Sequence, residues 1–73
     1  MEPTIGRIVI FNVPEDMKPK VNHAEKLPAI IVRAWSEGVV NLKIITDGEN
    51  DIWQTSVSQG NKPNQWNWPV KVE

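Results

Sequence analysis

The chain has 73 residues, with eight basic and nine acidic side chains and a formal net charge of −1 at pH 7. It contains no cysteine, which excludes disulfide bonds and thiolate metal sites. The charges are spread without a basic block, which argues against non-specific binding of duplex DNA. We expect one domain over residues 1–73, and a domain this small buries only about 60% of the surface of its unfolded chain. Oligomerisation is the first source of extra stability to expect.

No apolar run approaches the roughly 18 residues that a membrane-spanning helix needs. The N-terminal residues Met-Glu-Pro-Thr-Ile-Gly-Arg lack the charged and apolar regions of a signal peptide. The sequence therefore predicts a cytoplasmic protein without a membrane partner.

The first predicted strand covers Gly6–Asn12 and carries apolar residues at both its odd and its even positions. Ile8 and Ile10 would share one face, and Val9 and Phe11 would share the other. This pattern is typical of a strand buried on both sides.

The segment Val13–Leu27 is polar and contains two prolines, so we expect a long loop of the kind that is often functional or mobile. A short helical turn over Asn22–Lys26 is the alternative, with Asn22 as its N-cap and Glu25 at the third helical position. The Leu27-Pro28 pair would end such a turn at once.

Two β-branched runs, Pro28–Trp35 and Val39–Ile45, flank the linker Ser36–Gly38 and predict a β-hairpin. Strict alternation would place six side chains in the core: Ile30, Val32, Ala34, Val40, Leu42 and Ile44. The opposite face is mixed and is expected to be half covered or used for contact. Its members would be Ala29, Ile31, Arg33, Trp35, Val39, Asn41, Lys43 and Ile45.

The segment Thr46–Asp51 contains Asp-Gly, a strong turn signal. Ile52–Val57 then alternates, and predicts a strand with Trp53, Thr55 and Val57 on one face.

Ser58–Asn64 contains a glycine and a proline and is expected to be a loop. Gln65–Pro69 predicts a last strand on which Trp66 and Trp68 share a face. Pro69 confines this strand to an edge or to a strand end. Five short strands spaced by turns predict an all-β fold, a small five-stranded SH3-like barrel of antiparallel strands. An OB-type barrel is less favoured because it usually holds a helix and runs longer.

The chain contains four tryptophans and no tyrosine. One interpretation is packing, in which Trp53 fills the barrel and Trp66 and Trp68 cap an open end. The other is an aromatic platform, because tryptophan anchors interfaces and stacks on the bases of single strands. Two indoles two residues apart would crowd so small a barrel. At least one of Trp66 and Trp68 is therefore expected to be partly exposed or to lie in a subunit interface.

Arg33 and Trp35 lie two residues apart on one predicted strand, and Lys43 lies across the hairpin. On a solvated face, the guanidinium would simply lie over the indole. The more specific interpretation is an anion or phosphate pocket, with Arg33 as a planar fork and Trp35 as a stacking surface. The predicted binding residues are Arg33, Trp35, Lys43, Trp66 and Trp68.

No catalytic residue, metal ligand or cofactor is predicted. His23 is the single imidazole and has no evident orienting partner. Asp47, Glu49 and Asp51 resemble the start of a calcium loop, but position twelve of such a loop would be Ser58 and not a glutamate.

Six segments resemble a family of small uncharacterised proteins of tailed bacteriophages and prophages: Pro3–Val9, Pro28–Trp35, Val40–Leu42, Thr46–Asp51, Thr55–Val57 and Trp66–Pro69. The similarity runs nearly end to end and fails mainly in the Val13–Leu27 and Ser58–Asn64 loops. Many members carry a histidine in place of Ile10 and a basic residue in place of Leu27. The resemblance implies a phage origin and the cytoplasm of a host cell, without a mechanism.

A weaker, fold-level similarity links the chain to toxin ribonucleases of the MazF and CcdB type. These also begin with a Gly-x-Ile-Val strand, a long loop and a Pro-Ala-x-x-Val strand on an SH3-like barrel. The present chain is shorter, lacks their later helix, and carries Arg33 within a strand, away from the expected place of their catalytic arginine.

Three functions follow as hypotheses. The first is a phage-encoded protein-interaction module, a small homo-oligomeric accessory factor that binds a host or phage protein or itself. The second is a binder of a nucleotide or a short single strand through Arg33, Lys43 and Trp35 with Trp66 or Trp68. The third and least favoured is a toxin-like ribonuclease, which would need His23 or an aspartate near Arg33.

Overall fold

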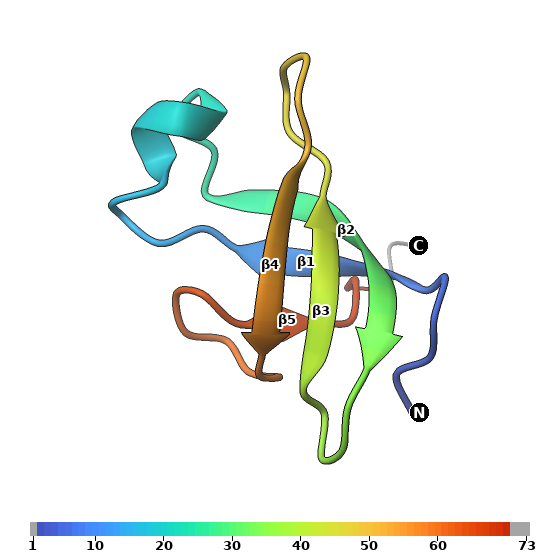
Figure 1. Ribbon diagram of the computed structural model, residues 1–73. Coiled ribbons are helices and arrows are strands. Elements are labelled where there is room, and N and C mark those ends of the chain that lie inside the picture. Colours follow the sequence, from blue (N-terminus) through green and yellow to red (C-terminus); the bar gives the residue numbers. More distant parts are fainter. Residues whose placement is uncertain (1, 71–73) are drawn as a thin grey trace.

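The computed structural model describes residues 2–70, and its strands form one antiparallel sheet in the order β4-β3-β2-β1-β5 (Figure 1). The expected all-β barrel of five antiparallel strands is confirmed, as a sheet curled into a half-barrel. A single 3-10 turn, η1, lies between the first two strands. The elements in chain order are β1 (Ile8–Asn12), η1 (Lys18–Val21), β2 (Lys26–Ala34), β3 (Val40–Ile44), β4 (Ile52–Val57) and β5 (Trp66–Asn67).

The outer edge of β5 is covered by the chain segment that follows β4. The Gly60 N–H donates to the Trp66 carbonyl at 2.9 Å, and the Trp66 N–H donates to the Ser58 carbonyl at 3.1 Å. The chain that leaves β4 therefore crosses to cover the free side of β5. The last strand ends at Asn67, before Pro69, as the proline predicts.

The core lies inside the curl of the sheet and takes side chains from every strand and from η1. The fully or nearly fully buried apolar residues are Val9, Phe11, Val13, Val21, Leu27, Ala29, Ile31, Val40, Leu42, Ile44, Val57 and Trp66. A single curled sheet has no second layer outside it, so the strands bury their apolar side chains mainly on the inner face.

The expectation that the first strand is buried on both faces is wrong. Val9 and Phe11 are fully buried, whereas Ile8 is 59% exposed and Ile10 is half-buried. The reason is the missing outer layer: nothing covers the convex side of β1.

The predicted alternation of the hairpin is right for β3 and wrong for most of β2. Val40, Leu42 and Ile44 are buried as expected. On β2 the buried side chains are Leu27, Ala29 and Ile31, while Ile30 is half-buried and Val32 is exposed.

A register irregularity explains this error. The pairing of β2 with β3 shifts between Ile31 and Arg33, which leaves Val32 as an extra residue. An inserted residue reverses the alternation beyond it. Arg33 therefore stays on the outer side, and Ala34 returns to the side of Val40.

The connection between β1 and β2 contains its helical turn earlier than expected. The turn Lys18–Val21 carries Pro19 in its first positions and ends at Asn22, which adopts the left-handed conformation with φ 57°. The alternative turn over Asn22–Lys26 is therefore wrong. Val21 is buried in the core, and burial of this side chain explains why the turn forms where it does.

Candidate binding surface

The outer side of β2, β3 and β4 holds most of the residues that the sequence singles out. The register places Ile30 opposite Lys43 and Lys43 opposite Trp53. Residues opposite each other on neighbouring strands share a face, so these three form a row across the sheet. A second row contains Arg33 opposite Asn41. We call this surface the indole face; its members are Arg33, Trp35, Asn41, Lys43, Trp53 and Thr55.

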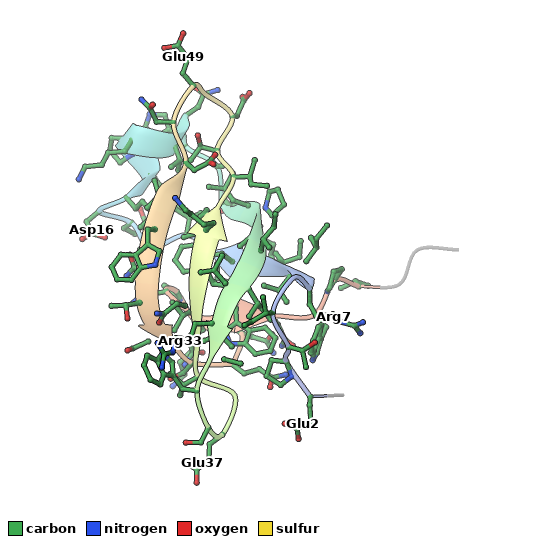
Figure 2. The ribbon with its side chains drawn as sticks, turned by 45° about the vertical axis from the view of Figure 1, so that its right-hand side comes forward. Glu2, Arg7, Asp16, Arg33, Glu37 and Glu49 are labelled. Carbon is green, nitrogen blue, oxygen red and sulfur yellow. The ribbon has the colours of Figure 1, made fainter. Side chains whose placement is uncertain are left out.

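Arg33 and Trp35 come together as the sequence predicts. The guanidinium carbon of Arg33 lies 4.1 Å from the centroid of the Trp35 ring, within the range of a cation–π contact. The ring remains 47% exposed. Figure 2 shows Arg33 near the hairpin that joins β2 and β3. The pair therefore presents an indole and a guanidinium together at one end of the face.

Asn41 holds the centre of the indole face. Its Oδ1 accepts hydrogen bonds from Trp35 Nε1, Thr55 Oγ1 and the Ser56 N–H, each at 2.9 Å. Asn41 is only 7% exposed, and a buried amide oxygen with three donors is well satisfied. Ser56 adopts the left-handed conformation with φ 56°, where β4 bulges against β3. The Asn41 side chain therefore orients the Trp35 indole and fixes the bulge.

Trp53 lies outside the barrel, and the interpretation that it fills the core is wrong. Its side chain is 55% exposed, in the middle of β4 and opposite Lys43. Among residues 2–70 it makes no recorded hydrogen bond or ring contact. Ile52 and Val57 take the inward positions of β4 instead. The bulge between them reverses the alternation, as in β2.

Trp66 and Trp68 do not belong to the indole face. Trp66 is fully buried, and its Nε1 donates to the Gly38 carbonyl at 2.8 Å, so a partner cannot reach it. Trp68 is half-buried and meets Trp66 edge to face, with centroids 5.2 Å apart. The Arg7 guanidinium lies 5.6 Å from its centroid. The expectation that at least one of this pair is partly exposed is confirmed by Trp68.

The structure thus unites Arg33, Trp35 and Lys43 on one face and adds Trp53, which sequence reasoning did not place there. It also gives a role to Asn41, which alternation had already placed on that face. The combination of an outward Trp53 and an inward Val57 depends on the bulge of β4. No local signal in Ile52–Val57 marks that bulge, because it arises from pairing with β3. A polar asparagine inside an apolar run was the one visible sign.

The strands themselves carry positive charge only. They contain Lys26, Arg33 and Lys43 and no acidic residue. The carboxylates of the described chain lie in the connections and near the N-terminus, as Glu37 and Glu49 do at two hairpin tips (Figure 2). Within residues 2–70 the ion pairs join Lys18 to Glu15 and Glu25. Arg33 and Lys43 therefore have no carboxylate partner among the described residues, and their charge is available to a ligand.

The residues of the ribonuclease hypothesis are not brought together. His23 precedes β2 and Arg33 lies near its end. Arg33 lies seven positions after Lys26 along β2, which is about 23 Å of strand at 3.3 Å per residue. No group of three or more His, Asp or Glu side chains in the described part of the chain is placed to hold a metal. No helix in that part is long and apolar enough to cross a membrane.

Comparison of the chain with protein-family models, with curated proteins and with solved structures found no match. Function is therefore inferred from the geometry of the indole face.

Proposed function

We propose that this protein is a protein-interaction module whose contact surface is the indole face. One observation carries the proposal: Trp35 and Trp53 are 47% and 55% exposed on a face that also holds two cations, and neither cation pairs with a carboxylate within residues 2–70. Tryptophan and arginine dominate the energetics of interfaces, where they anchor the partner in a desolvated centre. Three such side chains, Trp35, Trp53 and Arg33, on one face of a small sheet exceed what packing requires.

The Trp35 anchor is already ordered before any partner arrives. Asn41 Oδ1 holds its indole N–H, and the Arg33 guanidinium covers its ring. Binding then loses less side-chain entropy, a cost of about 0.5–1.5 kcal/mol for each side chain that is immobilised. The fixed orientation of the Trp35 side chain in the unbound protein therefore supports a role in recognition.

A protein partner is favoured over a nucleic acid by the neighbours of the indoles. Ile8 is 59% and Val32 is 38% exposed on the outer side of the sheet, and Ile30 lies between Ile8 and Lys43 in the register. Interfaces with nucleic acids are more polar and far more positive than this surface. Exposed isoleucine and valine beside indoles suit the apolar centre of a protein interface.

A different protein is favoured over a second copy of this chain. In a symmetric contact the same patch meets itself, so the indole faces of two copies would bring two surfaces together that both carry Arg33 and Lys43. Like charges across an interface are unfavourable. A partner that presents carboxylates fits better. The resemblance to phage proteins supports a host or phage protein as this partner and the host cytoplasm as its setting.

The second candidate function is capture of a nucleotide or a short single strand. It is favoured by the Arg33–Trp35 stack, because a base can stack on an indole or on a guanidinium plane. Trp53 would take the role that the sequence assigned to Trp66 or Trp68. Titration with nucleotides and oligonucleotides, followed by tryptophan fluorescence, tests it, and an unchanged signal across the panel rejects it.

Site-specific photocrosslinking tests the principal proposal. A photoreactive amino acid at position 53 is expected to trap a protein partner in cells, whereas the same group at the exposed Lys62 traps none. With the purified partner, Trp53→Ala and Trp35→Ala should each weaken binding at least tenfold. Trp68→Ala, outside the indole face, should leave the affinity within about twofold. Equal affinity of all these variants would contradict the proposal.

A further inference from the structure

The two edges of the sheet are protected to very different degrees. β5 has two residues, stands before Pro69, and is covered by Ser58–Gly60. β4 has six residues, Ile-Trp-Gln-Thr-Ser-Val, with no charged residue and no proline. Natural sheets usually protect a free edge strand from pairing with another chain by placing charged residues or proline on it or by keeping it short. β4 has none of these features before its bulge near Ser56.

The free edge of β4 has open backbone groups. No backbone hydrogen bond in the described part of the chain joins residues 52–57 to any segment other than β3. Along an antiparallel strand the N–H and C=O groups point to the two sides in turn. Roughly half of the groups of β4 therefore point away from β3 and can accept another strand.

A cleft of about 510 Å³ lies beside this strand, with Ile52 and Gln54 in its lining, and its volume is typical of ligand sites. Its apolar wall contains Pro14, Met17 and Ile52, and its polar lining contains Asp16, Lys20, Gln54 and Asn64. The connection between β1 and β2 thus stands on one side of the cleft and β4 on the other. Figure 1 shows η1 on the free side of β4.

We propose that an extended segment of a protein partner adds to β4 along Ile52–Thr55 as a further strand of the sheet. This inference rests on the proposed function for the class of partner and adds its conformation and docking edge. Alternate side chains of an added strand point to opposite faces. One set would enter the cleft beside Met17 and Ile52, and the other would lie beside Trp53 on the indole face.

A single extended chain fits this place better than the β4 edge of a second copy. Strands lie about 4.8 Å apart, so pairing of two β4 edges would put the second copy's β3 about 10 Å from β4. The connection with Pro14, Met17 and Lys20 occupies that side of the cleft. A single extended peptide brings no second sheet with it and therefore does not collide with this connection. Backbone pairing would supply the affinity, and the cleft would supply the specificity.

The test uses peptides recovered by panning a random twelve-residue library on the whole protein. Fluorescence anisotropy measures the affinity of a labelled synthetic peptide. N-methylation at alternate backbone amides should weaken binding more than tenfold, while methylation of the intervening amides should change it less than threefold. This readout leaves the protein unaltered, so a folding defect cannot mimic it.

Two further measurements locate the bound peptide. Saturating peptide should slow amide hydrogen exchange within Ile52–Thr55 at least tenfold. Lys20→Glu, in the cleft, should change the affinity, whereas Lys62→Glu, outside it, should not. Met17→Gln adds a second cleft variant, and its exchange pattern without peptide reports whether the fold is kept.

Other results would overturn the inference. These are the absence of any binding peptide, equal affinity of both N-methylated series, or slowed exchange confined to the neighbourhood of Arg33 and Trp35. Slowed exchange of β4 that grows with protein concentration alone would assign the edge to a second copy and overturn it too. The proposed function fails separately, if Trp35→Ala and Trp53→Ala bind the crosslinked partner as the wild type does.

Discussion

At the scale of single residues, the environment of each indole decides what it does. Trp66 is fully buried and satisfies its N–H on the carbonyl of Gly38. Gly38 has φ 79° and its missing Cβ would lie 3.4 Å from the Gln59 side chain. The hydrogen bond of the buried Trp66 indole therefore links the core to the hairpin between β2 and β3. At Gly38 in that hairpin the positive φ would strain any residue that has a Cβ. Trp53 has no such bond and stays available to a partner.

Trp66→Phe is expected to destabilise the protein by about 2–3 kcal/mol, since it leaves a cavity in the core and removes the hydrogen bond to the partly buried carbonyl of Gly38. Urea unfolding followed by circular dichroism measures the change. Trp53→Phe is the matched control, and an exposed position should change stability by less than about 0.5 kcal/mol. Equal effects of the two substitutions would refute the assignment of Trp66 to the core.

Asn41→Leu is expected to cost about 2–3 kcal/mol, because Trp35 Nε1, Thr55 Oγ1 and the Ser56 N–H all lose their acceptor. Asn41→Asp keeps an acceptor oxygen opposite Arg33 and should be milder at pH 7. Chemical unfolding gives both values. Unfolding of Asn41→Leu at the wild-type midpoint would show that the three bonds contribute nothing.

At the scale of the elements, two bulges shape the indole face. The first, in β2, leaves Arg33 outward beyond the buried Ile31. The second, in β4, allows both an outward Trp53 and an inward Val57. Each inserts one residue into one strand and so reverses its alternation. The bulge of β4 also carries Ser56 in the left-handed conformation.

Ser56 tests the second bulge directly. A β-branched residue is poorly tolerated at positive φ, and the left-handed conformation costs about 1–2 kcal/mol for a residue with a Cβ. Ser56→Val is therefore expected to lower the free energy of unfolding by about that amount, and Ser56→Gly to keep or raise it. Thermal unfolding of both variants is the measurement. A valine variant as stable as the glycine variant would argue against the left-handed bulge.

The connection before β2 carries a titratable pair. Lys18 Nζ lies 2.8 Å from Glu15 Oε1, and this hydrogen bond lowers the pKa of Glu15 below 4.5 and raises the pKa of Lys18 above 10.5. A carboxyl with a lowered pKa stabilises the fold above its unfolded pKa, and this contribution is lost as pH falls through the folded pKa. The lysine contribution is present below about 10.5 and is lost as pH rises through the raised pKa.

Carbon-13 NMR titration of the Glu15 carboxyl measures this effect. Its midpoint should lie below 4.5 in the wild type and rise toward 4.5 in Lys18→Gln. Both groups are exposed, so the change in stability should be small. An unchanged midpoint in the variant would show that Lys18 does not cause the shift.

At the scale of the whole molecule, the distribution of charge separates the sheet from its connections. The strands hold three cations and no carboxylate, and the carboxylates gather in the turns and loops. Face-to-face association of two copies would oppose like charges. The free edge of β4 adds a second contact region beside the indole face. One partner segment could contact both, because Trp53 belongs to β4.

The isolated protein is therefore expected to be a monomer of 8.3 kDa at micromolar concentration. Size-exclusion chromatography with light scattering measures its mass. A dimer that persists at high salt and dissociates on Trp53→Ala would contradict the heterologous partner and support the homo-oligomer that the sequence first suggested.

Much of the fold could be read from local patterns. Alternating β-branched runs and Gly or Pro turns locate the strands, and burial of Val40, Leu42 and Ile44 follows from alternation alone. The pairing of Arg33 with Trp35 was predictable from their spacing of two residues. The outward position of Arg33 was not, because alternation from the buried Ile31 would place it inside and only the bulge of β2 turns it outward. The burial of Ile31 and the exposure of Val32 were not, since one inserted residue reverses the order.

The sequence by itself thus determined the number and kind of the strands, the turns between them, and the pairing of a cation with an indole two residues away. These depend on neighbours within a few residues. Only the tertiary structure decided that Trp53 lies outside, that Trp66 lies inside, and that β4 keeps a free edge beside a cleft. The physical reason is that bulges, register and closure are settled by pairing between distant segments, whose energies no local pattern contains.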